Sequence, residues 1–228
     1  MKITFLGHAT TLVEAGGKTV VIDPFLTHNP SASLKAEEVK ADAVLLTHGH
    51  GDHISDALQI AKQNDCPIIA MVELANHFQS LGAKTHGLNL GGSYQFEFGR
   101  VKLTLAFHSS GIDLEDGSVK YAGEPSGILL TMGGKTFYHA GDTALFGDMK
   151  LIGEMHEIDV AALPIGDNFT MGPEDAAVAA SWIKAGVTFP IHYNTFPVIQ
   201  QDPERFVKLL EEKQLRGQVL QPGQSLEV

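Results

Sequence analysis

Three histidines and one aspartate crowd a single short stretch of this chain, residues 47–53, which reads T-H-G-H-G-D-H. The stretch follows the apolar run A-V-L-L at 43–46, which has the character of a buried strand. Two intervening glycines let the backbone turn sharply, so that the polar side chains can converge. Because neutral imidazole is the commonest metal ligand, the pattern predicts a metal site. The alternative is a solvated turn whose histidines have no joint role. The candidate ligands are His48, His50, Asp52 and His53.

Four candidate ligands from one turn exceed what a single open catalytic ion needs. A catalytic zinc ion takes about three protein ligands and keeps one position for water. Two-metal hydrolases hold their ions roughly 3.5 to 4 Å apart and clamp one oxygen between them. The loop therefore predicts two ions, and these would need further ligands from elsewhere in the chain.

The run H-G-H-G-D-H resembles the H-x-H-x-D-H signature of the metallo-β-lactamase fold superfamily of binuclear metal hydrolases. The superfamily pattern continues with an aspartate after an early strand, a lone histidine, an aspartate after a later strand and a histidine near the C-terminus. The matching residues in this chain are Asp23, His108, Asp142 and His192. The opening M-K-I-T-F-L-G-H-A-T and the closing I-H-Y-N-T-F-P further resemble a bacterial and archaeal subgroup of metal-dependent hydrolases. That subgroup is similar to N-acyl-phosphatidylethanolamine phospholipase D and to ascorbate-6-phosphate lactonase.

The resemblance implies a division of the ligands between two divalent ions. The first ion would be held by His48, His50 and His108, the second by Asp52, His53 and His192, and both by Asp142. A hydroxide bridging the ions would attack the substrate, and Asp52 could steer it. Zinc is the first expectation, while manganese, nickel and iron accept the same ligands. Taken alone, His108 and His192 could instead be core histidines, and Asp142 a turn residue.

Other polar residues are expected to support the site or to contact the substrate. Asp23, in D-P-F, is expected to hydrogen-bond a ligating imidazole or simply to shape a turn. His8, in L-G-H-A-T, is expected to donate a proton to the leaving group, to bind a substrate oxyanion or to pack as a structural residue. The expected substrate rim comprises Asn168, Thr170, Asn194 and Thr195. The histidines expected to be surface or packing residues are His28, His77, His86, His139 and His156.

Length and composition limit the function classes. The 228 residues are 43% hydrophobic, which suffices for one well-buried core, so a single hydrolase domain over 1–228 is expected. No apolar run approaches the roughly 20 residues that span a bilayer, and no signal peptide is recognisable, so the expected location is cytoplasmic. A net charge of -11 disfavours nucleic acid and favours a small-molecule substrate; a homo-oligomer is left open. The single cysteine, Cys66, is expected to be a buried thiol.

Strand-like and helix-like runs alternate in a pattern that occurs twice, once on either side of about residue 115. The expected strands lie near 2–6, 10–14, 18–23, 43–47, 67–70, 93–98, 100–107, 127–132, 135–139, 158–163 and 187–191. The expected helices lie near 54–63, 73–81 and 173–184. Gly133-Gly134 is a strong hairpin signal, and Gly99-Arg100 is expected to form another tight connection. Mixed sheets with helices outside suit the α/β fold class, as the four-layer α/β/β/α sandwich that the resemblance implies.

The function predicted from these features is a binuclear metal-dependent hydrolase that cleaves a phosphodiester or a lactone or ester bond of a small or medium substrate. The phosphodiester is preferred. Two alternatives are a non-catalytic metal-binding or regulatory protein and a metal-dependent oxygenase of the same fold. Because diiron flavoproteins of this fold alter the second histidine of the motif and His50 is intact here, hydrolysis is favoured over oxygen chemistry. The polar segment 109–126 is expected to be a mobile lid or a subunit contact.

Overall fold

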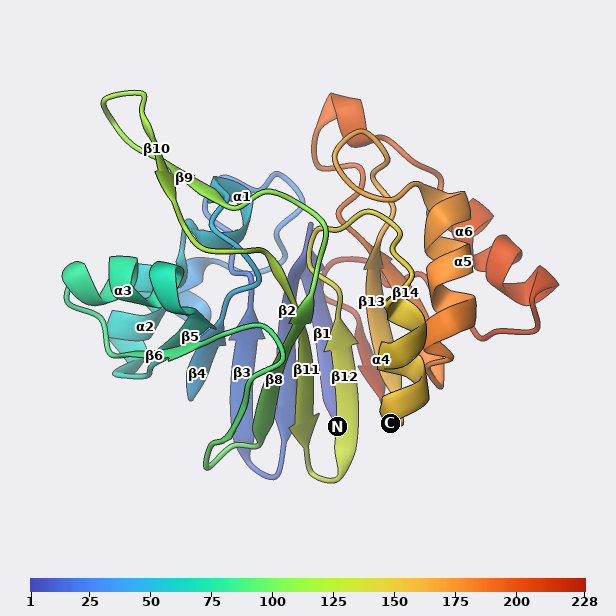
Figure 1. Cartoon of the computed structure of the whole chain (residues 1–228), viewed down its shortest axis with the longest axis horizontal. Coiled ribbons are helices and arrows are strands. Elements are labelled where there is room, and N and C mark those ends of the chain that lie inside the picture. Colours follow the sequence, from blue (N-terminus) through green and yellow to red (C-terminus); the bar gives the residue numbers. More distant parts are fainter.

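Two β-sheets pack face to face in the centre of the molecule, and helices cover the outer face of each (Figure 1). The computed structural model describes residues 1–228. In spatial order, the seven-stranded sheet comprises β15 (Ser225–Glu227), β1 (Lys2–Gly7), β2 (Thr10–Ala15), β3 (Lys18–Ile22), β4 (Ala43–Leu45), β5 (Ile68–Met71) and β6 (Thr85–Leu88). The six-stranded sheet comprises β14 (Val187–Ile191), β13 (Val160–Pro164), β12 (Lys135–His139), β11 (Ser126–Met132), β8 (Arg100–Leu105) and β7 (Ser93–Gln95). These layers confirm the predicted α/β/β/α sandwich.

The helices divide between the two outer faces (Figure 1). Those on the side of the seven-stranded sheet are η1 (Ala36–Glu38), α1 (Gly51–Ile54), α2 (Ala57–Asn64) and α3 (Val72–Ser80). Those on the side of the six-stranded sheet are α4 (Met149–Met155), α5 (Pro173–Ile183) and α6 (Pro203–Glu212), and the short η2 (Pro197–Ile199) lies in a loop. None of these helices combines the length and the apolar character needed to cross a bilayer.

Strand alternation explains why both faces of each sheet are buried. On β12, Phe137 points into the cluster of 24 buried residues between the sheets, whereas Tyr138 points into the cluster beneath α4, α5 and α6. Ile128 and Leu129 of β11 divide in the same way. Successive side chains of a strand face opposite ways, so one apolar run can serve two hydrophobic layers.

A repeated hairpin relates the two halves of the chain. The sequence G-G-K-T occurs at 16–19 and again at 133–136, and both glycines of each copy have positive φ. In the first copy the lysine side chain and the threonine amide donate to Asp42, at 2.9 and 2.8 Å. In the second copy the same two groups donate to Asp159, at 2.8 and 2.8 Å. The predicted Gly133-Gly134 turn is confirmed, and the halves share one building plan.

The strand ends bring the chemistry-bearing residues to one edge of the sandwich. Strands β3, β4 and β5 are parallel neighbours in one sheet, and β12, β13 and β14 are parallel neighbours in the other. Loops that leave the carboxyl ends of parallel strands emerge at a common edge. The segments that follow β1, β3, β4, β8, β12 and β14 therefore meet there.

The predicted boundary between the halves, near residue 115, is wrong. Strands β7 and β8 precede it, yet they pair with each other and β8 pairs with β11 of the second sheet. Strand β15 at the other end of the chain returns to β1 of the first sheet. The change of sheet therefore falls between β6 and β7, and sequence order does not match sheet membership at the C-terminus.

Several predicted elements have different ends in the structure. The helix expected near 54–63 is two helices, α1 and α2, separated by Asp56, which has a non-helical backbone. The strand expected near 93–98 ends at Gln95, because Phe96 and Gly99 exchange backbone hydrogen bonds in a tight turn. The hairpin expected at Gly99-Arg100 therefore turns slightly earlier. The strand expected near 100–107 ends at Leu105.

Several short elements were not predicted. They are β6, β15, α4, α6 and an arm of two antiparallel strands, β9 (Gly111–Asp113) and β10 (Val119–Tyr121). Helix α6 carried a readable signal, since Pro203 is its first residue and the Asp202 carboxylate accepts from the Glu204 amide at 3.0 Å. The arm lies within the segment 109–126 and projects from the site edge (Figure 1). Its role as a lid or contact remains a prediction.

We predict that the Cys66 thiol resists alkylation in the folded protein. The residue is 5% exposed, and burial raises the pKa of its thiol to about 11. At pH 8 only about one thiol in a thousand would then be the reactive thiolate. Mass spectrometry after iodoacetamide treatment should show almost no labelling of the native protein and complete labelling in denaturant. Rapid labelling of native protein would show that the thiol is accessible.

Candidate metal centre

The loop after β4 is held tightly against its neighbours. Helix α1 begins at Gly51, directly after the extended backbone of His50. At Gly49 an added Cβ would come within 2.6 Å of the Ala122 Cβ, so only glycine lets the loop pass this close. The loop is therefore fixed by its backbone before any side chain is considered. Its fully buried candidate ligands are His48 and His53, and its partly exposed ones are His50 and Asp52.

One group of ring nitrogens comes from this loop and from the segment after β8. His50 Nδ1 lies 3.0 Å from His48 Nε2 and 3.3 Å from His108 Nε2. All three ligand atoms lie within 4.8 Å of one another. The structure thus brings together the three histidines predicted to hold the first ion.

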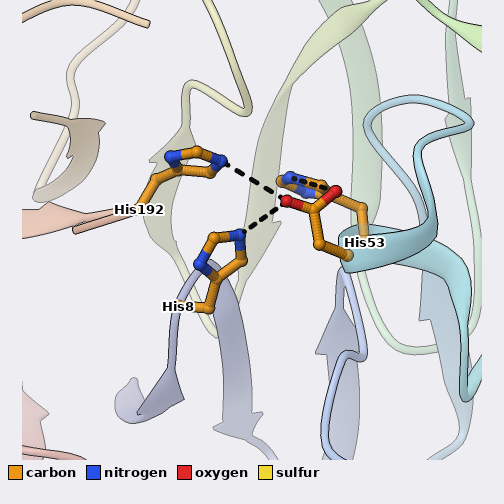
Figure 2. Close-up of side chains that lie close together, drawn as sticks. His8, His53 and His192 are labelled. Atoms are coloured by element: carbon orange, nitrogen blue, oxygen red, sulfur yellow. Dashed lines mark hydrogen bonds and ion pairs between the residues drawn. The ribbon is translucent and has the colours of Figure 1, made fainter. Parts of the chain in front are cut away.

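A second group surrounds the carboxylate of Asp52. His8 Nε2 lies 3.0 Å from Asp52 Oδ2, and His192 Nε2 lies 3.7 Å from the same oxygen. His53 Nε2 lies 4.0 Å from the other oxygen. In Figure 2 dashed lines join the labelled His8, His53 and His192 rings to one carboxylate, and the distances above identify it as that of Asp52. The three residues predicted for the second ion are together, and His8 joins them.

Asp142 lies between the two groups. Its Oδ2 is 3.0 Å from His192 Nε2 and 3.6 Å from His108 Nε2, and its Oδ1 is 3.4 Å from His53 Nε2. The side chain is 3% exposed. One carboxylate therefore contacts nitrogens of both groups, which is the arrangement that a bridging ligand requires.

Asp23 organises two of the imidazoles from behind. Its carboxylate is fully buried and accepts hydrogen bonds from the Thr47 amide at 2.8 Å, the Thr47 hydroxyl at 2.6 Å and His53 Nδ1 at 2.8 Å. Because the Thr47 hydroxyl donates to Asp23, it must accept from His48 Nδ1, 2.9 Å away. Nδ1 therefore carries a proton in both rings, which leaves Nε2 as the atom that faces the centre and could bind a cation.

Buried polar atoms that lack a hydrogen-bond partner show whether divalent cations would fit the two ligand groups. His53 Nε2 and Asp142 Oδ1 are both buried, neither has a hydrogen-bond partner, and they lie 3.4 Å apart. Leaving such groups unsatisfied is costly in a folded protein. An imidazole nitrogen and a carboxylate oxygen together are ligands that divalent zinc, manganese, nickel or iron accepts once the ring gives up its Nε2 proton. The residues present therefore fit divalent cations.

The charge states of the cluster suit cation binding. Burial lowers the pKa of His48 well below its usual value, with His53 adding to the effect, so the ring is neutral. Burial alone would favour neutral Asp142, but His192 and His53 outweigh it and hold the pKa of that carboxyl well below its usual value. The pKa of Asp52 is likewise lowered, against burial, by the nearby His192 ring and by the hydrogen bond from His8. Two carboxylates thus stay ionised. Against burial, Asp142 raises the pKa of His53 well above its usual value and that of His192 to about 9, so a divalent cation would take the place of the Nε2 protons of these two rings.

Thr195 is the one predicted rim residue that reaches the cluster. Its hydroxyl lies 2.9 Å from His8 Nδ1, and both side chains are buried. Burial lowers the pKa of His8 to about 4, so this ring is neutral and can donate from Nε2 to Asp52 while it accepts from Thr195. Both ring nitrogens of His8 are therefore occupied within the protein.

The other three predicted rim residues do not reach the histidine groups. The Asn194 side chain accepts from the Gln201 amide at 2.8 Å, and the Thr170 hydroxyl donates to the Met171 carbonyl at 3.2 Å. Asn168 is exposed and has no side-chain hydrogen bond. None of the three contacts the histidine groups, so a substrate role for them remains a prediction.

The five remaining histidines lie outside both ligand groups, as expected. His139 is the informative case, because it is fully buried on β12. Its Nε2 donates to the Ala9 carbonyl at 2.8 Å, and its Nδ1 accepts from the Gly141 amide at 3.1 Å. His139 is thus a satisfied packing residue that ties the two sheets together.

Sequence reasoning missed two anchors of the site. The buried Asp56 carboxylate accepts from the Leu26 amide at 2.6 Å and the Thr27 amide at 3.0 Å, which fixes the loop after Asp23. Ser110 accepts from the Gly49 amide at 3.1 Å. An aspartate four residues after Asp52 was a readable hint of a second acidic anchor, whereas nothing local distinguishes Ser110.

Known proteins resemble this chain over its whole length. A family model described as beta-lactamase superfamily domain matches residues 18–193. A UPF0173 metal-dependent hydrolase of Geobacillus sp. (strain WCH70) is 58% identical over 228 residues, which is 100% of each chain. The structure of Igni18, a metallo hydrolase from the archaeon Ignicoccus hospitalis, has a TM-score of 0.88 and 36% identity, and the match covers 100% of this chain and 98% of that one.

The fold is also shared with a more distant protein. A metallo-beta-lactamase fold protein from Bacillus subtilis has a TM-score of 0.71 at 17% identity, with 100% of this chain and 98% of that chain covered. The family model and the relatives of 36% identity and more confirm the resemblance to the metallo-β-lactamase fold superfamily. The narrower likeness to a phospholipase D and to a lactonase stays a prediction.

We predict that Asp23→Asn weakens divalent metal binding about 10- to 100-fold, because the amide cannot fix the tautomers of His53 and His48 as the carboxylate does. Competition with a metal-binding dye measures the affinity, and circular dichroism checks that the fold persists. Asp159→Asn is the matched control, since that carboxylate also accepts a backbone amide, at 2.8 Å, but lies outside the centre. Equal affinities for the two variants would contradict the role given to Asp23.

Proposed function

The chain belongs to the family described as beta-lactamase superfamily domain and is a metal-dependent hydrolase; we propose that it uses two divalent ions. The bond that these ions would cleave is a phosphodiester or a lactone or ester bond. The observation that carries the proposal is the Asp142 carboxylate, which contacts nitrogens of both histidine groups. A carboxylate placed in this way can share its oxygens between two cations. We keep a small or medium phosphodiester as the first choice of substrate and zinc as the first choice of metal.

The proposed ligands follow the two groups in the structure. The first ion would be held by His48, His50 and His108, the second by Asp52, His53 and His192, and both by Asp142. When bound, two such ions lower the pKa of a shared water toward about 7 and polarise the bond to be cleaved. The protein's part is to hold its lone pairs in place, which Asp23 does for His48 and His53.

Asp52 is proposed to act on the attacking water as well as on the second ion. Its side chain is 28% exposed, more than those of its partners His8 and His192, so it can reach both the ion and solvent. His8 is proposed as a positioning residue for Asp52. Its burial and its two internal hydrogen bonds favour this role over direct proton donation to the leaving group or binding of a substrate oxyanion.

The surface beside the first group supports an enzyme rather than a non-catalytic metal-binding or regulatory protein. A non-catalytic site would be expected to be closed to solvent. Here a pocket of about 440 Å³ is lined by His50 and His108. Substrate can therefore approach two of the proposed ligands directly. The intact His50 continues to favour hydrolysis over oxygen chemistry.

We predict that Asp142→Ala lowers bound metal from about two ions per chain to one or fewer and reduces hydrolysis at least about 100-fold, since even outer contacts to metal ligands are worth 10- to 100-fold. Plasma mass spectrometry and assays with aryl phosphodiester and lactone panels measure the two effects. Asp148→Ala, an exposed aspartate at the start of α4, is the control. Full metal content and full activity in the Asp142 variant would overturn the binuclear proposal.

We also predict that Thr195→Val lowers kcat about 10-fold with little change in KM, because His8 loses the hydroxyl that orients it toward Asp52. Thr195→Ser retains a hydroxyl and should keep most of the rate. Steady-state kinetics on any substrate that the wild-type enzyme turns over provides the measurement. If the valine and serine variants behave alike, His8 does not act through Thr195.

A further inference from the structure

The pocket beside the first histidine group has two unlike walls. One wall is formed by His50 and His108, and the other by residues of the arm and of the chain that follows it. That second wall includes Val119, Tyr121, Glu124 and Pro125. The pocket has a volume of about 440 Å³, which leaves room for a substituent several atoms in size next to the proposed reaction centre.

The second wall is anchored rather than loose. Gly123 has a φ of +82°, and an added Cβ there would come within 2.6 Å of Met71 and 2.7 Å of Glu73. Ala122, the neighbouring residue, packs against Gly49 of the ligand loop. The backbone between Tyr121 and Glu124 is therefore tied to the loop that carries His50. The Tyr121 hydroxyl donates to Glu124 Oε1 at 2.9 Å, which links the ring and the carboxylate to each other.

The charges around this pocket have one sign. Glu124 lines it, and neither lysine nor arginine does. Asp113 and Glu73 are close enough to affect the pKa values of His50 and Tyr121. The one basic side chain of β10, Lys120, is instead within 3.2 Å of His77 Nδ1 on α3. A phosphate or carboxylate entering the pocket would meet no cationic donor from the protein.

We propose that this pocket binds a substrate substituent that carries an ammonium group, which would contact the face of the Tyr121 ring and the Glu124 carboxylate together. The inference rests on the proposed function, because it places the scissile bond at the histidine groups. An aromatic face and a carboxylate are the two protein groups that attract a quaternary or primary ammonium ion. The phosphodiester or ester group of the substrate would then lie at the ions, and its positively charged group would lie at the opposite wall of the pocket.

The direct test measures binding without catalysis. Three methyl alkylphosphonates serve as probes, identical except for an alkyl end that is 2-(trimethylammonio)ethyl, the isosteric 3,3-dimethylbutyl or 2-carboxyethyl. Calorimetry with metal-loaded protein at low salt should give about 10-fold tighter binding for the cationic probe than for its neutral isostere. The carboxylate probe should bind most weakly. Equal affinities, preference for the carboxylate, or no binding of any probe would overturn the proposal.

Variants locate the preference in the pocket. Glu124→Gln should reduce the preference for the cationic probe about three- to fivefold, and Tyr121→Leu about two- to fivefold, while Tyr121→Phe keeps the ring and most of the ring's effect. Glu97→Gln is the matched control, because it removes the same charge from a side chain that is 93% exposed and outside the pocket. A control that lowers the preference as much as Glu124→Gln would assign it to net charge and overturn the proposal.

Hydrolysis assays distinguish a failure of the pocket assignment from a failure of the proposed function. Aryl phosphodiesters and aryl esters with the same three alkyl ends are supplied to the metal-loaded enzyme. Cleavage with the cationic member fastest would support both proposals. If no member of either series is cleaved while the phosphonates still show the cation preference, the bond type proposed above fails and the pocket assignment stands.

Discussion

The buried carboxylate of Asp23 is the contact on which the centre depends. It accepts three hydrogen bonds, two from Thr47 and one from His53, and through the Thr47 hydroxyl it also determines the proton position on His48. A fully buried charge is tolerated only when its oxygens are satisfied in this way. The end of β3 and the end of β4 must therefore meet in one geometry, and that geometry points two imidazole Nε2 atoms inward.

The two halves of the sandwich contribute to the site in unequal but complementary ways. The first sheet supplies His8, Asp23 and the 47–53 loop, while the segments after β8, β12 and β14 of the second sheet supply His108, Asp142 and His192. Neither half holds a complete set. Strand β15, near the C-terminal end of the sequence, pairs with β1 of the first sheet, and one domain over 1–228 stays a prediction.

Much of the centre could be predicted from the sequence because its ligands lie directly after apolar strands. The H-x-H-x-D-H loop is local, and Asp142 and His192 each follow a run that reads as a strand. The hydrogen bond between His8 and Thr195 joins residues 187 positions apart, so no local pattern could reveal it. The wall made by Tyr121 and Glu124 depends on an arm whose short strands carry little periodicity. Strands β7 and β8 belong to the second sheet and β15 belongs to the first because of the strands that they pair with. Hydrophobic patterns do not encode which strands pair.

The measurement that tests the central claim most directly is anomalous diffraction from crystals of metal-loaded protein, recorded on both sides of the absorption edge of the metal. Two peaks roughly 3.5 to 4 Å apart are predicted. One should lie in contact with His48, His50 and His108, the other with Asp52, His53 and His192, and Asp142 should contact both. A single peak at full loading, or peaks away from Asp142, would contradict a shared binuclear centre.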